Sequence, residues 1–479
     1  MEISRIFFIH TLSSLFFIQE MKQKFLRWYY KILGKLAHGY LAKHTPYIIG
    51  INGSVGKTSC RMIVHQTLQR FLTNKKIYTS PKNFNGELGM SLSIFQQEKW
   101  EPNIFFFITT LLKFIGKRFF WSKPYDIILL EYGIDRPGEM DFLVSIAKPH
   151  IGIFTAIDSV HSEQFGNPAE IAREEVKMLK NTLELGFLNA NDVYAVQLKD
   201  HLHIDYLTYQ TEGNDIAADI YFKDEKFFLS DFKGGVGVQF NTWIKEKKYS
   251  ISTNILGKAN YGYIWLWLAI AWILDYKYAR AEARTEEPIL KSGSNELLEL
   301  TYQLQPGRLS VFHGIENSVI IDSTYNASPL SVRKIINTAH NIKAQLFPQR
   351  KIILVLGDMR ELWDLTEREH RMIAGYVSQA ADKVILVGKY MTDYLADELE
   401  KVWYDTKNIE KFFDANIAGK YIQKILKEPG DEYLIVCKWS QNTIFLEEAV
   451  KHFLLNPEDQ QELTRQSDWR LSKKKKYFR

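Results

Sequence analysis

The fold is decided by residues 48–59, which read IIGINGSVGKTS. The stretch begins as an apolar run typical of a buried strand and ends in a glycine-rich turn closed by Gly56, Lys57 and Thr58. Residues 60–72 then carry apolar side chains at helical spacing. A strand, a glycine loop and a helix in this order predict a phosphate-binding loop, because the N–H groups of the loop and of the helix N-terminus bind anions.

This loop predicts that the chain binds ATP. Lys57 would reach the outer phosphates, and the hydroxyl of Thr58 would bind Mg²⁺. The strict GxxxxGK[ST] pattern is not met, because Ile51 stands where its first glycine would be. The alternative is a glycine-rich turn that only starts a helix. The residues expected around the phosphates are Gly53, Ser54, Val55, Gly56, Lys57, Thr58 and Ser59.

Length and composition indicate an ordinary globular protein of two or three domains, with 479 residues, 46% hydrophobic and 24% charged. The two cysteines, Cys60 and Cys437, provide no disulfide framework and no cysteine metal site, so a reducing cytoplasm is the expected compartment. The net charge of +5 is concentrated in residues 1–45. Because the rest is close to neutral, the charge does not favour a nucleic-acid partner.

Residues 1–45 are predicted to be a helical extension at a membrane surface. The apolar run 6–18 is too short to span a bilayer. The following residues combine basic side chains with one apolar helical face, a pattern that suits an anionic lipid interface. The alternatives are a helix packed on the protein body or a dimer contact. The residues of the apolar face are Phe25, Leu26, Trp28, Tyr29, Ile32, Leu33 and Leu36.

A second apolar stretch, residues 104–121, is interrupted by Lys113, Lys117 and Arg118, so a transmembrane helix is not expected. It would lie beside the N-terminal helix and form one membrane-facing or substrate-facing surface with it.

Two more strands carry candidate metal ligands. Residues 126–131 read as a buried parallel strand that ends in Glu131. Ligands of such sheets gather at the carboxyl ends of the strands, so Glu131 is expected to bind Mg²⁺. The strand 150–155 leads into a segment that contains His161. A histidine alone is more often structural, but this position makes it a candidate ligand.

These segments together resemble the Mur ligases, the ATP-dependent amide-forming enzymes of cell-wall peptide synthesis, from about residue 46 to 453. The similar motifs are the phosphate loop, the substrate-side loop 80–89 with Asn83 and Asn85, Glu131-Tyr132-Gly133, the segment 161–166 with His161, Asn260, Arg308 and Asp322. The resemblance implies ATP contacts from Asn260, Arg308 and Asp322. It also implies a catalytic set of Lys57, Glu131, His161 and Arg308.

Within the family, residues 322–329 (DSTYNASP) and 356–362 (LGDMREL), with His370-Arg371, most resemble the MurF branch. Its members join D-alanyl-D-alanine to UDP-N-acetylmuramoyl-tripeptide. The resemblance implies that Asn326, Ser331 and Asp358 face the incoming dipeptide. The alternative for residues 356–358 is only the end of a strand.

The chain departs from the family pattern in two places. Members usually begin with a domain that holds the UDP-sugar, whereas about 45 apolar and basic residues precede the phosphate loop here, which suggests a substrate gripped otherwise and presented near a membrane. Members also commonly carry a carbamylated lysine where this chain has Glu175. Glu175 would replace that carbamate, completing a metal set of Thr58, Glu131, His161 and Glu175. The alternative is an exposed helix glutamate without a metal role, and Lys177 should point to a different face.

The sequence therefore predicts an α/β protein in three parts. These are the helical extension 1–45, a P-loop ATPase domain with a parallel-rich sheet over 46–300, and a Rossmann-like doubly wound domain over 301–479. With ATP and Mg²⁺, it would activate a carboxylate as an acyl phosphate and join it to an amine, in the cytoplasm at the inner face of the membrane. The rivals are a ligase of the same fold with another acid and amine, and a non-catalytic ATP-binding module at the membrane.

Overall fold

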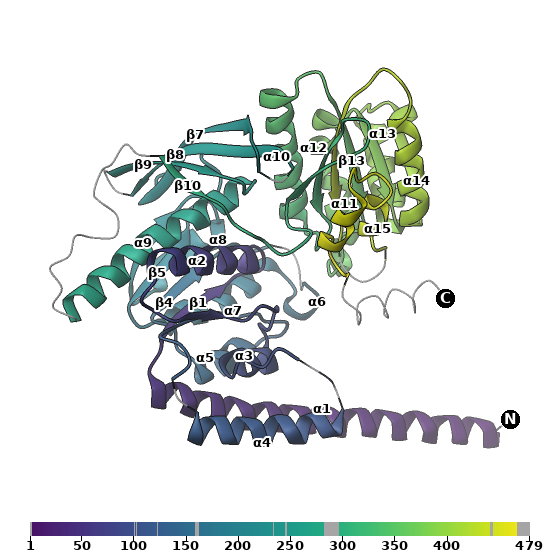
Figure 1. Cartoon of the computed structure of the whole chain (residues 1–479). Coiled ribbons are helices and arrows are strands. Elements are labelled where there is room, and N and C mark those ends of the chain that lie inside the picture. The colour runs from purple at the N-terminus through teal and green to yellow at the C-terminus, as the bar shows by residue number, and fades with distance from the viewer. Residues whose placement is uncertain are drawn as a thin grey trace.

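The computed structural model describes residues 2–99, 101, 103–121, 123–158, 162–232, 234–244, 247–281, 297–440 and 444–466. The described chain forms two sheets with helices on their faces, one 10-stranded and one 6-stranded (Figure 1). The first sheet uses strands up to Leu300, and the second begins at Ser310. This architecture confirms the predicted α/β class.

The first sheet has a parallel half built around the strand that feeds the phosphate loop. In spatial order its strands are β2 (Ile77–Thr79), β3 (Ile127–Glu131), β1 (Tyr47–Asn52), β4 (Ile151–Phe154), β5 (Leu185–Asn189) and β6 (Asp205–Tyr209). Strands β1, β3 and β4 are buried at every residue, as expected for a sheet covered on both faces. Because β1 lies between β3 and β4, the loops that follow these three strands meet at one edge.

The other half of this sheet is mostly antiparallel. Its strands are β7 (Ile220–Leu229), β8 (Val236–Ile244), β9 (Lys247–Thr253) and β10 (Leu297–Leu300). β7, β8 and β9 form a meander, and β10 pairs with β9 in parallel. β7, β8 and β9 lie within residues 206–255, a stretch of the sequence that is rich in β-forming residues and glycine.

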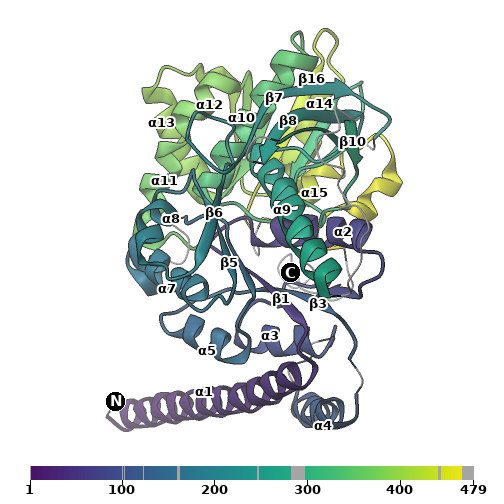
Figure 2. The same ribbon diagram turned by 90° about the vertical axis from the view of Figure 1, so that its left-hand side faces the viewer.

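Helices cover both faces of the first sheet. α2 (Lys57–Phe71) and α9 (Lys258–Ala281) pack together on one face. α3 (Glu87–Ile94), α5 (Glu139–Ile146) and α7 (Pro168–Lys180) cover the other face (Figures 1 and 2). Two short helices, α6 (Ser162–Phe165) and α8 (Val193–Leu198), complete this part. α9 buries Trp265 and Trp267 fully, yet no helix among the described residues is long and apolar enough to cross a bilayer.

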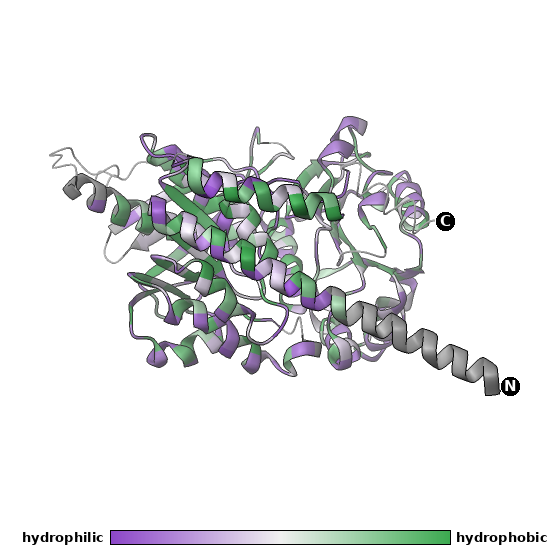
Figure 3. Ribbon diagram, turned by 90° about the horizontal axis from the view of Figure 1, so that it is seen from below, coloured by the Kyte–Doolittle hydropathy of each residue, from purple (hydrophilic) through white to green (hydrophobic). Residues whose placement is uncertain are grey.

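An extra layer lies outside α3 and α5. It consists of α1 (Glu2–His44) and α4 (Ile104–Phe120), which run side by side (Figures 1 and 3). The second half of α1 packs on the body through a buried stripe, so the packed-helix alternative is confirmed for that half. Side chains 1–20 and 22 lie outside the described part. The stripe consists of Tyr29, Leu33, Ala37, Tyr40 and Leu41.

The second sheet is the predicted doubly wound one. In spatial order its strands are β11 (Ser310–His313), β12 (Val319–Ser323), β16 (Tyr433–Lys438), β13 (Lys351–Gly357), β14 (Lys383–Val387) and β15 (Ile409–Phe412). Only the edge pair β11–β12 is antiparallel. One face carries α10 (Pro329–Leu346), α12 (Ala374–Ala380) and α13 (Ala396–Lys401), and the other α14 (Ala415–Leu426) and α15 (Glu447–Val450).

The remaining elements are short. They are α11 (Thr366–Met372), the 3₁₀ turns η1 (Lys199–His201), η2 (Trp363–Leu365), η4 (Thr406–Asn408) and η5 (Pro457–Glu462), and the π turn η3 (Met391–Leu395).

Candidate active site

The phosphate loop joins β1 to α2, as the sequence predicts. The segment after β4 holds it in place: Ser54 N–H donates to the carbonyl of Ala156 at 2.7 Å, and Thr155 Oγ1 donates to the carbonyl of Val55 at 2.6 Å. Lys57 Nζ donates to the carbonyl of Gly53. The first turn of α2 has no capping side chain, so its N–H groups can bind phosphate oxygens.

Both loop glycines are required by geometry. Gly53 and Gly56 have φ values of +119° and +90°, in the region that side chains disfavour. A Cβ on Gly53 would collide with the hydroxyl of Thr155, and a Cβ on Gly56 would collide with the hydroxyl of Tyr263. Thr155 and Tyr263, neither of which belongs to the motif, therefore lie directly against the two glycines.

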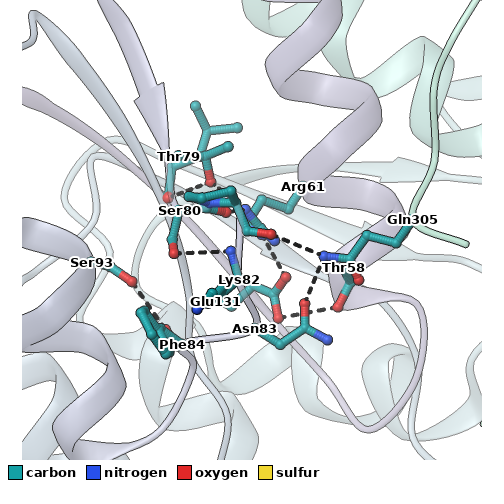
Figure 4. A network of polar contacts seen from close by, with 12 residues as sticks. Thr58, Arg61, Thr79, Ser80, Lys82, Asn83, Phe84, Ser93, Glu131 and Gln305 are labelled. Carbon is teal, nitrogen blue, oxygen red and sulfur yellow. Dashed lines mark hydrogen bonds and ion pairs between the residues drawn. The ribbon is translucent and has the colours of Figure 1, made fainter. Parts of the chain in front are cut away.

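The end of β3 brings Glu131 to the phosphate loop. Thr58 Oγ1 lies 3.3 Å from Glu131 Oε2, so the two predicted Mg²⁺ ligands are neighbours. Glu131 Oε1 is also bound by Arg61 Nε at 2.5 Å. Figure 4 shows Arg61 reaching from α2 past Glu131 to Thr79, 2.7 Å away, and to the carbonyl of Ser80.

Arg61 is a site residue that the sequence reasoning missed. Its side chain is buried, and the guanidinium holds both Glu131 and the start of the substrate-side loop after β2. A signal existed in the sequence, since Arg61 stands beside Cys60 on the side of the helix that carries Val64. A buried arginine of this kind needs a carboxylate partner, and the nearby β3 supplies it.

Glu175 lies beneath the phosphate loop rather than on the surface. It is 1% exposed, which overturns the alternative of an exposed helix glutamate. Its Oε2 accepts hydrogen bonds from Asn52 Nδ2 at 3.0 Å and from Gly53 N–H at 3.3 Å. Burial raises the pKa of Glu175 to about 7, although Lys57 favours its charged form. Its metal role stays a prediction, while Lys177 pairs with Asp141 and Glu174 instead.

This carboxyl makes stability depend on pH in the metal-free protein. The native state binds the proton more tightly, so the free energy of unfolding should fall as the pH rises from about 4.5 to about 7. Glu175→Gln should remove this dependence and should be more stable than the wild type at pH 8 by about 3 kcal/mol. Urea denaturation from pH 5 to 8 in the presence of a chelator measures the difference. Parallel curves for the two proteins would contradict the prediction.

A cavity of about 1910 Å³ lies between the domain that contains the 10-stranded sheet and the domain that contains the 6-stranded sheet. This volume is larger than that of a typical small-molecule site. The first domain lines it with the phosphate loop from Ser54 to Ser59, the Asn83–Asn85 segment and Asn260. The second domain contributes the turn with Arg308, and also Asn326 and Ser331. Most of the predicted ATP and substrate residues are therefore brought to a single space.

Five of the described residues that were predicted for the site do not line this cavity: Gly53, Glu131, Glu175, Asp322 and Asp358. Asp322 is fully buried below it, where burial raises its pKa to about 6. Asp358 accepts a hydrogen bond from Met391 N–H at 2.9 Å, while Glu361 of the same loop lines the cavity. Contacts of Asp322 with ribose and of Asp358 with a dipeptide stay predictions. His161 lies outside the described residues.

Lys438 is a second residue that the sequence reasoning missed. It ends the apolar strand β16 and lines the cavity, with Nζ donating to Ser323 Oγ at 3.1 Å and to the carbonyl of Asn326 at 2.7 Å. Burial, with Arg308 nearby, lowers its pKa to about 7. A lysine at the carboxyl end of an apolar strand is the sequence signal that could have identified it.

Polar contacts join the domains across the cavity. Asn83 Nδ2 donates to Tyr325 Oη at 2.6 Å, and Gln305 Nε2 donates to Asn83 Oδ1 at 3.2 Å. Asp158 accepts a hydrogen bond from Leu330 N–H at the start of α10, at 3.1 Å. The guanidinium of Arg308 lies over the ring of Tyr325, 4.2 Å from its centroid. These contacts place the substrate-side loop against the second domain.

The donor set fits ATP and Mg²⁺. Among the described residues, no three His, Cys, Asp or Glu side chains gather into a metal cage. Mg²⁺ is instead commonly held by one or two carboxylates together with substrate phosphates, which suits Glu131 and Thr58 beside a phosphate loop. Two buried polar atoms, Arg308 Nε and Ser54 Oγ, lack a hydrogen-bond partner among the described residues and are available to a ligand.

Comparison with known families decides the classification. Residues 51–263 match the model of the Mur ligase middle domain, and residues 307–438 match that of the Mur ligase, glutamate ligase domain. The chain belongs to the Mur ligase family. Relatives to which this Mur ligase is similar include the UDP-N-acetylmuramoyl-tripeptide–D-alanyl-D-alanine ligases of Borreliella burgdorferi and Bacillus subtilis. The first is 26% identical over 80% of this chain and 72% of its own, and the second 25% identical over 89% and 79%.

Solved structures agree with the fold of this Mur ligase. MurF from Thermotoga maritima in complex with ADP has a TM-score of 0.62 at 20% identity, covering 89% of this chain and 83% of its own. MurF from Acinetobacter baumannii has a TM-score of 0.62 at 19% identity, covering 85% and 77%. At these identities the likeness concerns the fold.

Proposed function

We propose that this chain is an ATP-dependent, ADP-forming peptide ligase that adds D-alanyl-D-alanine to UDP-N-acetylmuramoyl-tripeptide in peptidoglycan precursor synthesis. The observation that carries the proposal is the cavity that joins a phosphate loop in one domain to Asn326 and Ser331 in the other. Relatives named for this reaction match over most of the chain. Both substrates and ATP would meet in this cavity.

The reaction requires the acid to be activated, because a carboxylate is a poor electrophile. The γ-phosphoryl group of ATP passes to the carboxylate of the tripeptide, and the amine of the dipeptide then attacks the acyl phosphate, giving an amide and phosphate. Lys57 and the first turn of α2 bind the phosphates and reduce their charge. When bound, Mg²⁺ held by Thr58 and Glu131 would neutralise further phosphate charge.

The second domain supplies the other half of the site. Arg308, held over the ring of Tyr325, directs positive charge into the cavity and stabilises the transferring phosphoryl group. Asn326, in the loop before α10, and Ser331, in the first turn of that helix, would lie next to the dipeptide, although the hydroxyl of Ser331 already caps the helix with Ser328. Asn83 and Asn85 line the side of the cavity assigned to the acid substrate. Closure of the two domains would exclude water from the acyl phosphate.

Phosphate release from ATP tests the proposal directly. The full chain is incubated with ATP, Mg²⁺ and UDP-N-acetylmuramoyl-tripeptide, with and without D-alanyl-D-alanine. Release should require both substrates, and mass spectrometry should detect the pentapeptide product. ATP binding without this turnover would contradict the proposal and favour a ligase of the same fold with another acid and amine.

We also propose a cytoplasmic location with peripheral contact to the inner, anionic face of the membrane. A nucleotide-linked substrate and ATP are both intracellular compounds, which supports the compartment. The contact would be made by the layer of α1 and α4, which lies on the far side of α3 and α5 from the sheet.

A further inference from the structure

We propose that the outer surface of α1 and α4 is a docking surface for an anionic lipid bilayer. The proposal deepens the peripheral contact stated above by naming the residues that make it and the lipid chemistry that they fit, and it rests on that contact. It does not depend on which acid and amine the ligase joins. The surface, called here the α1–α4 face, is defined by the exposed apolar side chains of the two helices.

α4 differs from an ordinary surface helix, because most of its large apolar side chains face outward rather than toward the protein core. Its described buried side chains are only Thr110 and Phe114, which face the protein. Apart from Thr109 and Lys113, the exposed residues of α4 are apolar and recur at helical spacing, so they form a stripe along the helix. The exposed fractions are 67% for Ile104, 74% for Phe105, 53% for Ile108, 62% for Leu112, 38% for Ile115, 59% for Phe119 and 89% for Phe120.

α1 extends the same surface. Met21, Phe25 and Trp28 lie on one side of this helix and are 53%, 42% and 57% exposed, whereas Tyr29 on the neighbouring side is buried. The two helices touch, since Tyr29 Oη donates to the carbonyl of Phe107 at 2.8 Å and the rings of Phe25 and Phe107 are 6.2 Å apart. Figure 3, which views this side, shows both helices running across it with hydrophobic turns. Exposed apolar side chains that adjoin one another in this way mark interaction surfaces.

The charge of the α1–α4 face favours an anionic bilayer as the partner. Among the side chains of α1 and α4 that the structure describes, none is an aspartate or glutamate, and the exposed basic ones are Lys24, Arg27, Lys31, Lys35, Lys43 and Lys113. A symmetric contact between two copies would bring these like charges together, which opposes a dimer through this face. An anionic bilayer surface instead offers phosphate groups to the basic residues and an apolar boundary to the aromatic side chains.

The mode of contact is interfacial. In α4 the apolar stripe is bordered by Lys113, whose Nζ donates to Gln97 Oε1 at 2.6 Å. The helix packs along α1 and, through the ring of Phe114, against Phe95. Such a helix can bury its stripe to the depth of the lipid headgroups while its basic side chains remain near phosphate. The face therefore fits a surface-bound orientation.

Vesicle binding tests the proposal. The full chain is mixed with vesicles of phosphatidylcholine containing about one third phosphatidylglycerol, and bound protein is measured by flotation. Wild type should float with these vesicles and much less with pure phosphatidylcholine. Phe105→Glu with Leu112→Glu should weaken binding at least tenfold, because both exposed side chains lose their apolar contact and add negative charge.

The matched control is Phe413→Glu with Ile417→Glu. These side chains are 74% and 59% exposed on the other domain, where Phe413 precedes α14 and Ile417 lies in its first turn, and the pair adds the same charge. The control should float like the wild type, and both double variants should keep wild-type ligation without vesicles. Failure of the wild type to float, or equal flotation of the α4 variant, would overturn the proposal. So would a dimer in light scattering that the α4 variant dissociates, because the face would then serve a second copy.

Discussion

Replacement of Arg61 by methionine is expected to lower the free energy of unfolding by about 3–5 kcal/mol and to remove nearly all ligase activity. The buried guanidinium is the charged partner of Glu131 and also binds Thr79 and the carbonyl of Ser80. Methionine matches much of its apolar bulk but leaves the Glu131 carboxylate buried without its cation. Urea denaturation followed by tryptophan fluorescence measures the loss, and phosphate release measures the activity.

Two further variants distinguish the loss of the Arg61–Glu131 ion pair from a general effect of replacing an arginine in α2. Arg70→Met, in the exposed last turn of the same helix, should change stability by less than about 0.5 kcal/mol. The double variant Arg61→Met with Glu131→Leu should recover much of the stability, since the uncompensated charge is gone, while activity stays lost. If Arg61→Met alone is as stable as the wild type, the ion pair does not support this site.

Replacement of Lys57 by methionine is expected to lower kcat by about 10³-fold while stability changes by less than about 1 kcal/mol. The Lys57 ammonium folds onto the carbonyl of Gly53 inside the phosphate loop, where it can reach the outer phosphates of ATP. Removing it takes away positive charge where phosphoryl transfer develops negative charge. Phosphate release under saturating substrates measures kcat.

Lys76→Met is the control for this change, because Lys76 is an exposed lysine next to β2, away from the cavity. It should retain wild-type kcat. A Lys57→Met variant that works within tenfold of the wild type would mean that the phosphate loop does not serve catalysis, which would favour the non-catalytic rival.

The sequence was informative where chemistry is tied to the ends of strands. Thr58 and Glu131 could be predicted as neighbours because the ends of adjacent parallel strands meet at one edge, and the structure has them 3.3 Å apart. Strand ends do not decide where each carboxylate points. Asp322 lies near the end of β12 and Asp358 follows β13, yet Oδ1 of each accepts a hydrogen bond from a backbone N–H and neither residue lines the cavity.

Other features depend on tertiary contacts that periodicity does not reveal. Residues 261–271 of α9 are apolar on every side, so this part has no helical pattern to detect, and its position between α2 and β7 explains why it is buried. Arg61 gains its role only when β3 places Glu131 beside α2. On α1, apolar side chains serve two purposes: Leu33 packs inward and Trp28 points outward, and sequence spacing alone did not distinguish them.

The junction between α1 and β1 sets a fixed geometry. α1 ends at His44 and β1 begins at Tyr47, with Thr45 N–H bonded to the carbonyl of Leu41 at 2.8 Å. Only two residues therefore separate the long helix from the strand that carries the phosphate loop. With α1 lying on a bilayer, this short, hydrogen-bonded joint would act as a spacer that holds the mouth of the cavity at a constant height and tilt above the lipid.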